Sequence, residues 1–138
     1  TQMLNTKVKD FMQRKLPNIT PDTEMTTAIA ELQKFKLLGA PVFDKDKCLV
    51  GFISEQELLK PLTQSSYFCD GMVKVSQLMQ TEVVTVSGDT NIIELAQQMQ
   101  PGKPKNYPVV EGVKVIGMIS RADVLKALYD NYISCQTH

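Results

Sequence analysis

The heptapeptide Gly51-Phe52-Ile53-Ser54-Glu55-Gln56-Glu57 returns later in the chain as Gly117-Met118-Ile119-Ser120-Arg121-Ala122-Asp123. Both copies read glycine, an apolar residue, isoleucine, serine, two variable residues and an acid. The likeness continues outward, so that residues 7–62 can be laid on residues 74–128, with one residue missing from a turn of the second copy. Identities in this register include the pairs Met12/Met79 and Gln13/Gln80. A repeat of this length predicts two copies of one folding unit.

The first copy predicts the order short strand, helix, strand, strand, helix. Apolar residues recur at helical spacing over residues 25–35. Two short apolar runs follow at 42–43 and 49–53, separated by a polar turn, and they predict a hairpin. A second helix is expected from Ser54, ended by Pro61 and the polar residues after it.

The second copy repeats this order. Its expected elements are a strand at 83–86, a helix at 92–99, strands at 107–110 and 113–119, and a helix from Ser120 through Tyr129. The first of these helices should end early, because Pro101, Gly102 and Pro104 cannot continue it. Residues 100–107 are therefore expected to form a stiff, exposed loop that carries Lys103 and Lys105.

Each copy is too small to bury a good core by itself, so the two are expected to pack through their sheets across a pseudo-twofold axis. The fold class is thus α/β (α+β). The expected organisation is a first repeat over residues 1–63 with a helix at 1–12, a connector at 64–73, a second repeat over 74–133 and a tail at 134–138.

Composition narrows the function classes. The 138 residues include 15 Lys and Arg against 15 Asp and Glu, which leaves no surplus charge for neutralising nucleic-acid phosphates. No apolar run approaches the roughly 20 residues that span a bilayer. The three cysteines form no C-x-x-C pair, which favours reduced thiols and a cytoplasmic protein. We expect neither nucleic-acid nor membrane binding.

Catalytic groups are sparse. The only histidine is the last residue, His138, and Cys48, Cys69 and Cys135 are far apart in the sequence. This distribution predicts neither a nucleophile–base pair nor a metal site. We therefore expect a protein that is not an enzyme and that holds no catalytic cofactor and no metal.

The motifs resemble those of tandem cystathionine-beta-synthase (CBS) domains, the Bateman module. The resemblance covers nearly the whole chain and rests on the two heptapeptides, on Asp22-Thr23 and Asp89-Thr90, and on Ala40-Pro41-Val42-Phe43 and Tyr107-Pro108-Val109-Val110. It implies a regulatory module that binds an adenine nucleotide or other adenosyl compound, such as AMP, ADP, ATP or S-adenosylmethionine, in clefts between the repeats. It also implies a homodimer formed through helical faces, and a protein target that senses occupancy.

The serine and acid of the heptapeptide motif are chemically suited to such a ligand. A helix that begins at Ser120 offers free backbone N–H groups to a phosphate, and Asp123 one turn later can accept ribose hydroxyls. The same spacing is also a capping box, in which serine and acid satisfy each other's backbone N–H groups. Glu57 has the reach that a capping box prefers, whereas aspartate is the residue that the family uses for ribose. Two unequal clefts are expected.

The resemblance assigns residues to both clefts. The stronger cleft would contain Asn18, Ile19, Thr20, Leu37, Leu38, Ala40, Met118, Ile119, Ser120, Arg121 and Asp123. The weaker cleft would contain Phe52, Ile53, Ser54, Glu57, Val84, Thr85, Lys105, Asn106 and Tyr107. In this assignment the lysine-bearing loop and the better ribose acceptor belong to different clefts. For Lys103, Lys105 and Arg121, a merely solvated surface charge stays the alternative.

Two other functions compete with the sensor. One is a structural or scaffold homodimer whose clefts are degenerate and empty, which Glu57 in place of aspartate and the shortened loop before Tyr107 favour. The other is the detached regulatory part of a larger transporter or enzyme. The absence of an initiator methionine before Thr1 is compatible with that second alternative.

Overall fold

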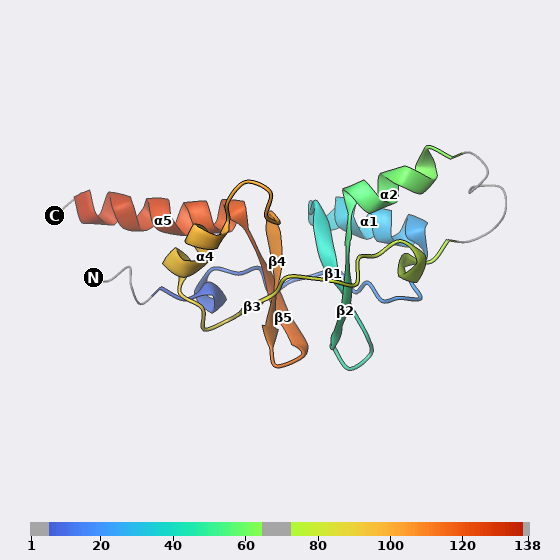
Figure 1. Cartoon of the computed structure of the whole chain (residues 1–138), viewed down its shortest axis with the longest axis horizontal. Coiled ribbons are helices and arrows are strands. Elements are labelled where there is room, and N and C mark those ends of the chain that lie inside the picture. Colours follow the sequence, from blue (N-terminus) through green and yellow to red (C-terminus); the bar gives the residue numbers. More distant parts are fainter. Residues whose placement is uncertain (1–5, 65–72, 137–138) are drawn as a thin grey trace. The chain divides into compact units, whose positions relative to one another are not determined.

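The computed structural model of the chain describes residues 6–64 and 73–136 (Figure 1). Its elements are, in chain order, the 3-10 turn η2 (Val8–Asp10), helix α1 (Met25–Phe35), strands β1 (Gly39–Phe43) and β2 (Leu49–Ser54), helix α2 (Glu55–Leu62), the 3-10 turn η3 (Val75–Gln77), strand β3 (Val86–Ser87), helix α4 (Ile92–Gln98), strands β4 (Asn106–Glu111) and β5 (Lys114–Ser120), and helix α5 (Arg121–Gln136). The α/β fold class is confirmed.

The chain forms two compact units whose composition differs from the two sequence repeats. Among the described residues, the first-repeat unit comprises 15–64, 73–83 and Val113–Val115. The second-repeat unit comprises 6–14, 84–112 and 116–136. Each unit thus contains the short 3-10 segment that precedes the other repeat in the sequence, η2 in one case and η3 in the other.

The first-repeat unit is built on the antiparallel hairpin of β1 and β2. Helix α1 buries Met25, Ala28 and Leu32 on one face, and it ends before Lys36, whose backbone is left-handed with a φ of 56°. These side chains join a core that also contains Ile19, Ala40, Val42, Ile53, Leu58, Val73 and Val75. The hairpin and both predicted helices of the first copy are therefore present.

The short first strand of this copy is missing. Its place is marked by one backbone hydrogen bond, from the N–H of Phe43 to the carbonyl of Ile19 at 3.2 Å. The N–H of Thr20 donates instead to the Thr23 hydroxyl at 2.9 Å, and Pro17 and Pro21 on either side have no N–H to give. Too few donors are left for a ladder, so the prediction of a strand here was wrong.

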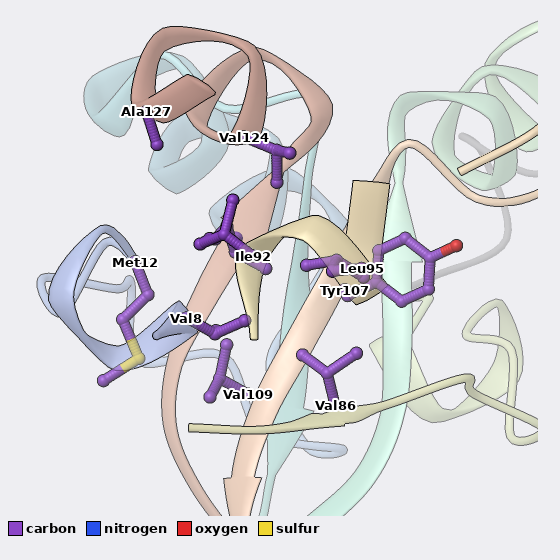
Figure 2. Packing of buried hydrophobic residues seen from close by; sticks show 10 residues of the cluster. Val8, Met12, Val86, Ile92, Leu95, Tyr107, Val109, Val124 and Ala127 are labelled. Carbon is purple, nitrogen blue, oxygen red and sulfur yellow. The ribbon is translucent and has the colours of Figure 1, made fainter. Parts of the chain in front are cut away.

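The second-repeat unit has the complete pattern, with the three-stranded sheet β3–β4–β5. Strand β3 pairs in parallel with β4, Val86 opposite Val109. Figure 2 shows side chains from the N-terminal segment, the sheet and both helices converging in one core. The labelled members are Val8, Met12, Val86, Ile92, Leu95, Tyr107, Val109, Val124 and Ala127.

The exposed loop expected at residues 100–107 is shorter than predicted, because Asn106 and Tyr107 belong to β4 and Tyr107 is buried. Helix α4 ends at Gln98, and residues 101–105 are exposed. Helix α5 runs to Gln136, further than Tyr129, and so continues into the segment expected to be a tail.

The expected helix at residues 1–12 is wrong for its described part, which forms only the 3-10 turn η2. Residues 1–5, most of the expected connector (65–72), and residues 137–138 lie outside the described residues, and Cys69 and His138 fall among them.

None of the described helices is both long and apolar enough to cross a membrane. The described residues also contain no cluster of metal-ligating side chains.

Candidate functional site

The second helix of each repeat begins in the same way. The first helical N–H of α5, that of Arg121, donates to the carbonyl of Lys105 at 2.8 Å. At the matching place in α2, the N–H of Glu55 donates to the carbonyl of Leu38 at 3.0 Å. Each helix start is therefore fixed to the loop before the first long strand of its own unit, and one of its free backbone donors is already used.

The start of α5 forms a capping box that leaves hydrogen-bonding capacity unused. The N–H of Ser120 donates to Asp123 Oδ2 at 2.9 Å, and the N–H of Asp123 donates to Ser120 Oγ at 3.1 Å. Within the described part of the chain, Asp123 Oδ1 and the hydroxyl proton of Ser120 have no hydrogen-bond partner. Both side chains are half-buried. The carboxylate can therefore still accept bonds from a ligand.

The start of α2 uses its polar groups more completely. Glu57 Oε1 accepts the N–H of Ser54 at 2.8 Å and also the hydroxyl of Ser54 at 2.6 Å. Glu57 Oε2 accepts the side-chain amide of Gln80 at 2.9 Å. Both oxygens of this carboxylate thus accept hydrogen bonds within the unit, and the Ser54 hydroxyl donates its proton to one of them.

Charge separates the two helix starts as well. The start of α5 carries Arg121 and lies against the backbone of Lys105, and both of these residues are exposed. The start of α2 carries Glu55 and Glu57, and it lies against Leu38. The family resemblance assigned Lys105 to the weaker cleft, whereas the structure joins its backbone to that of Arg121, in the helix turn that carries the ribose-acceptor candidate Asp123.

Several of the predicted cleft residues serve the core of their own unit. Ile19, Ala40 and Ile53 are fully buried in the first-repeat unit, and Tyr107, Met118 and Ile119 are buried in the second. Burial also raises the pKa of the Tyr107 hydroxyl above its ordinary value. These residues can offer a ligand little more than backbone groups and the edges of side chains.

The other predicted residues remain more accessible. Leu38 and Val84 are 58% and 56% exposed. Asn18 is exposed, whereas Thr85, Asn106 and Phe52 are half-exposed. Each predicted cleft draws some of its residues from one unit and the rest from the other.

Sequence reasoning missed the role of Gln80. The sequence does contain a sign of this role, since the repeat register places a glutamine at both Gln13 and Gln80. Both residues are exposed. Packing does not require a glutamine at such a position, so its recurrence could have pointed to a hydrogen-bonding role.

Apolar grooves lie between the helices within each unit. A groove of about 510 Å³ runs between α1 and α2, and its apolar lining comprises Ile29, Leu32, Leu37, Leu38, Leu58, Leu59 and Leu62. A groove of about 570 Å³ lies between α4 and α5, and its apolar and aromatic lining comprises Ile93, Ala96, Leu125, Leu128, Tyr129 and Tyr132. Both grooves are thus lined mainly by side chains suited to contact with another protein surface.

Comparison with known proteins identifies the family. The CBS domain family matches residues 8–63 and 75–130, which together form most of the chain. A CBS domain-containing protein of Dictyostelium discoideum is 28% identical over 131 residues, covering 88% of this chain and 90% of that protein. Several other curated relatives are longer, and the chain spans only 15 to 58% of their lengths.

Solved structures with adenosyl ligands are also similar. CBSX2 in complex with AMP superposes with a TM-score of 0.79 at 29% identity, covering 92% of this chain and 98% of that one. The CBS domain pair of protein MJ0100, in complex with 5-methylthioadenosine and S-adenosyl-L-methionine, superposes with a TM-score of 0.73 at 25% identity, covering 89% of this chain and 99% of that one.

Proposed function

Because this chain belongs to the CBS domain family, we propose that it is a regulatory module that binds an adenosyl ligand at the start of α5. Residues 1–63 and 74–133 are the two repeats of this module. The observation that carries the proposal is the uncommitted carboxylate oxygen of Asp123, beside the exposed cations Lys105 and Arg121. Similar structures with bound AMP, or with 5-methylthioadenosine and S-adenosyl-L-methionine, support the ligand class.

The groups at the start of α5 suit an adenosyl compound. The two neighbouring hydroxyls of a ribose need an acceptor, and Asp123 Oδ1 is an anionic one, which makes the strongest hydrogen bonds to neutral donors. The Ser120 hydroxyl proton is a further donor for an oxygen of the ligand.

Charge favours a ligand with phosphate over one with a cationic sulfonium. Arg121 and Lys105 outnumber the carboxylate of Asp123 at this helix start, and the positive end of the α5 dipole adds to them. Arginine also pairs with phosphate through two parallel hydrogen bonds. We therefore place AMP, ADP and ATP ahead of S-adenosylmethionine and 5-methylthioadenosine.

The test is thermal unfolding of the purified chain with each of these compounds and with GMP as a control for the base. A ligand at 100 times its dissociation constant adds about 2.7 kcal/mol to the free energy of unfolding. In a domain of this size the unfolding midpoint then rises by several degrees. Asp123→Ala should abolish the shift, whereas the matched variant Glu57→Ala should keep it.

Three results would contradict the proposal. They are no shift with any adenosyl compound, an equal shift with GMP, and a shift that survives Asp123→Ala but not Glu57→Ala. A larger shift with S-adenosylmethionine than with AMP would leave the site in place and overturn only the preference for phosphate.

The module would transmit occupancy as a cytoplasmic homodimer. Apolar grooves on the helical side of each unit support pairing with a second copy, since exposed apolar surface of this kind marks interaction sites. A nucleotide that binds two arrangements of the module unequally would shift their populations and alter the surface that a target protein meets. Sedimentation should give a dimer mass, and Leu59→Lys with Leu125→Lys should give a monomer. A monomeric wild-type chain would refute the dimer.

A scaffold role is the second candidate function. The fully engaged carboxylate of Glu57 favours it, because at least one of the two helix starts has little left to offer a ligand. The longer relatives add the possibility that the module regulates further domains of a larger protein. A dimer that binds none of the tested adenosyl compounds would place the scaffold role first.

A further inference from the structure

Gln13 and Gln80 are identical in the repeat register and occupy equivalent backbone positions, but their side chains differ in hydrogen bonding. The main chain of Gln80 pairs with Phe52 in β2 through two hydrogen bonds of 2.8 Å. The main chain of Gln13 pairs with Met118 in β5 through bonds of 2.8 and 2.9 Å. Each glutamine thus lies beside the strand that leads into the serine and acid of its own unit.

Only the Gln80 side chain reaches the acid. Its amide nitrogen donates to Glu57 Oε2 at 2.9 Å. In the described structure the Gln13 side chain makes no hydrogen bond to Asp123, which is shorter than glutamate by one methylene. With the same backbone register on both sides, the length of the acidic side chain is the difference that accounts for the contact.

We propose that the Gln80–Glu57 hydrogen bond is an intramolecular latch that closes the α2 helix start to ligand, so that the chain binds one adenosyl ligand rather than two. This inference rests on the proposed function. The amide N–H of Gln80 makes the type of bond that a ribose hydroxyl would make, a neutral donor to a carboxylate oxygen. It therefore competes with a ligand for Glu57 Oε2.

The other groups at the α2 start reinforce the latch. Glu57 Oε1 already accepts two hydrogen bonds from Ser54, so Oε2 is the oxygen on which a ribose depends. Glu55 adds a second negative charge at the first helical position, where α5 has Arg121. A phosphate at this helix start would meet repulsion where the α5 start offers attraction.

The number of ligands bound per chain tests the latch. Isothermal titration of the full chain with AMP should give one site for the wild type. The double variant Glu57→Asp with Gln80→Ala restores the acid of the α5 start and removes the competing amide, and it should bind two. The matched control Gln13→Ala should still bind one AMP, because the Gln13 side chain makes no hydrogen bond to Asp123.

A second set of variants isolates the opened site. Asp123→Ala should reduce AMP binding of the wild type from one per chain to none. Adding Glu57→Asp and Gln80→Ala to Asp123→Ala should restore one. If the double substitution prevents folding, Gln80→Ala alone should add a second and weaker binding event.

The outcomes separate the latch from the proposed function. Two AMP molecules per wild-type chain would overturn the latch and leave the sensor in place. One AMP per folded double variant, or no second event in Gln80→Ala, would also overturn the latch alone. No binding to any of these chains would refute both the sensor and the latch, whereas binding to the double variant but not to the wild type would support the latch and refute the α5 site.

Discussion

The starts of α2 and α5 have the same capping arrangement, but they differ in how many of their carboxylate oxygens accept hydrogen bonds. In both, a serine and an acid form a capping box, and the first helical N–H is tied to a carbonyl of the preceding loop. At α2 the acid is long enough to meet Gln80, and both carboxylate oxygens are used. At α5 the shorter acid leaves one oxygen uncommitted.

This difference shows that a repeated motif does not imply a repeated function. Capping and ligand binding draw on the same serine and acid, so a helix start that satisfies itself fully has less to give to a ligand. Both helix starts have a neighbouring glutamine, but only the longer acid, Glu57, accepts a hydrogen bond from it. Matched substitutions at equivalent positions can test how far the two units correspond.

The largest effect is expected in the two cores. Ile53 and Ile119 are equivalent residues and both are fully buried. Ile53→Ala and Ile119→Ala should each lower the free energy of unfolding by about 2–5 kcal/mol through lost burial and a residual cavity. Urea unfolding measures both, and Ile→Val at either site should cost about 0.5–1.5 kcal/mol. A cost below 1 kcal/mol for one alanine variant alone would show that the two cores are not equivalently packed.

The next largest loss of stability is expected from substituting the glycine that begins each heptapeptide. A Cβ added at Gly51 would lie 2.8 Å from the Gln80 carbonyl oxygen and 2.6 Å from Met79 Sδ. A Cβ at Gly117 would lie 2.7 Å from the Gln13 oxygen and 2.7 Å from Met12 Sδ. Because backbone must move in both cases, Gly51→Ala and Gly117→Ala should each cost about 1–3 kcal/mol.

Urea unfolding of the two glycine variants checks this expectation, with Gly102→Ala as a control at a site where an added Cβ meets nothing within 4 Å. The control is not cost-free, because Gly102 has a φ of 88° that disfavours alanine. A cost at Gly51 and Gly117 no greater than at Gly102 would contradict the close approach of the two segments.

Removing the N-cap serines should lower stability by less than the glycine substitutions do. Ser54→Ala and Ser120→Ala should each cost about 0.5–2 kcal/mol, the usual range for a lost N-cap. Ser54→Ala should cost more, because the Ser54 hydroxyl also donates to a charged carboxylate at 2.6 Å. Thermal unfolding checks the order, and Ser→Thr at each position keeps the hydroxyl as a control. A greater loss for Ser120→Ala would reverse the ranking of the two caps.

The sequence predicted the architecture well because a repeat constrains every element twice. The early end of α4 followed from Pro101 and Pro104, whose effect is local. The missing strand near Ile19 depended on a competition that spacing does not reveal, in which the Thr23 side chain takes the N–H of Thr20. The packing of Val8 with the second repeat is a long-range contact, and no local pattern encodes it.

The site was predicted only in part, for a similar reason. The serine–acid spacing was visible in the sequence, and it correctly marked two helix starts with capping geometry. Whether a carboxylate oxygen stays available depends on side chains brought in from elsewhere, as Gln80 is brought to Glu57. The position of Lys105 beside Arg121 likewise depends on how the loop folds back onto the helix.

The smallest expected effect concerns the N-terminal segment and acid pH. Asp89 forms ion pairs with Lys9 at 3.2 Å and Lys7 at 3.8 Å, whereas its first-repeat counterpart Asp22 makes no side-chain ion pair within the described residues. The hydrogen bond and charge of Lys9, and then the charge of Lys7, hold the pKa of Asp89 below its ordinary value of 3.8. This carboxylate therefore contributes stability above its unfolded pKa, and the contribution is lost as pH falls through the lower folded pKa.

The matched variants Asp89→Asn and Asp22→Asn isolate that contribution. Asp89→Asn should make the unfolding midpoint slightly less dependent on pH below about 4, and the difference should shrink in high salt because the pair is exposed. Asp22→Asn should show no salt-sensitive change of this kind. Equal acid profiles for Asp89→Asn and the wild type would mean that solvent screens the pair completely, so that the buried side chain of Val8, and not charge, holds the N-terminal segment in the second-repeat unit.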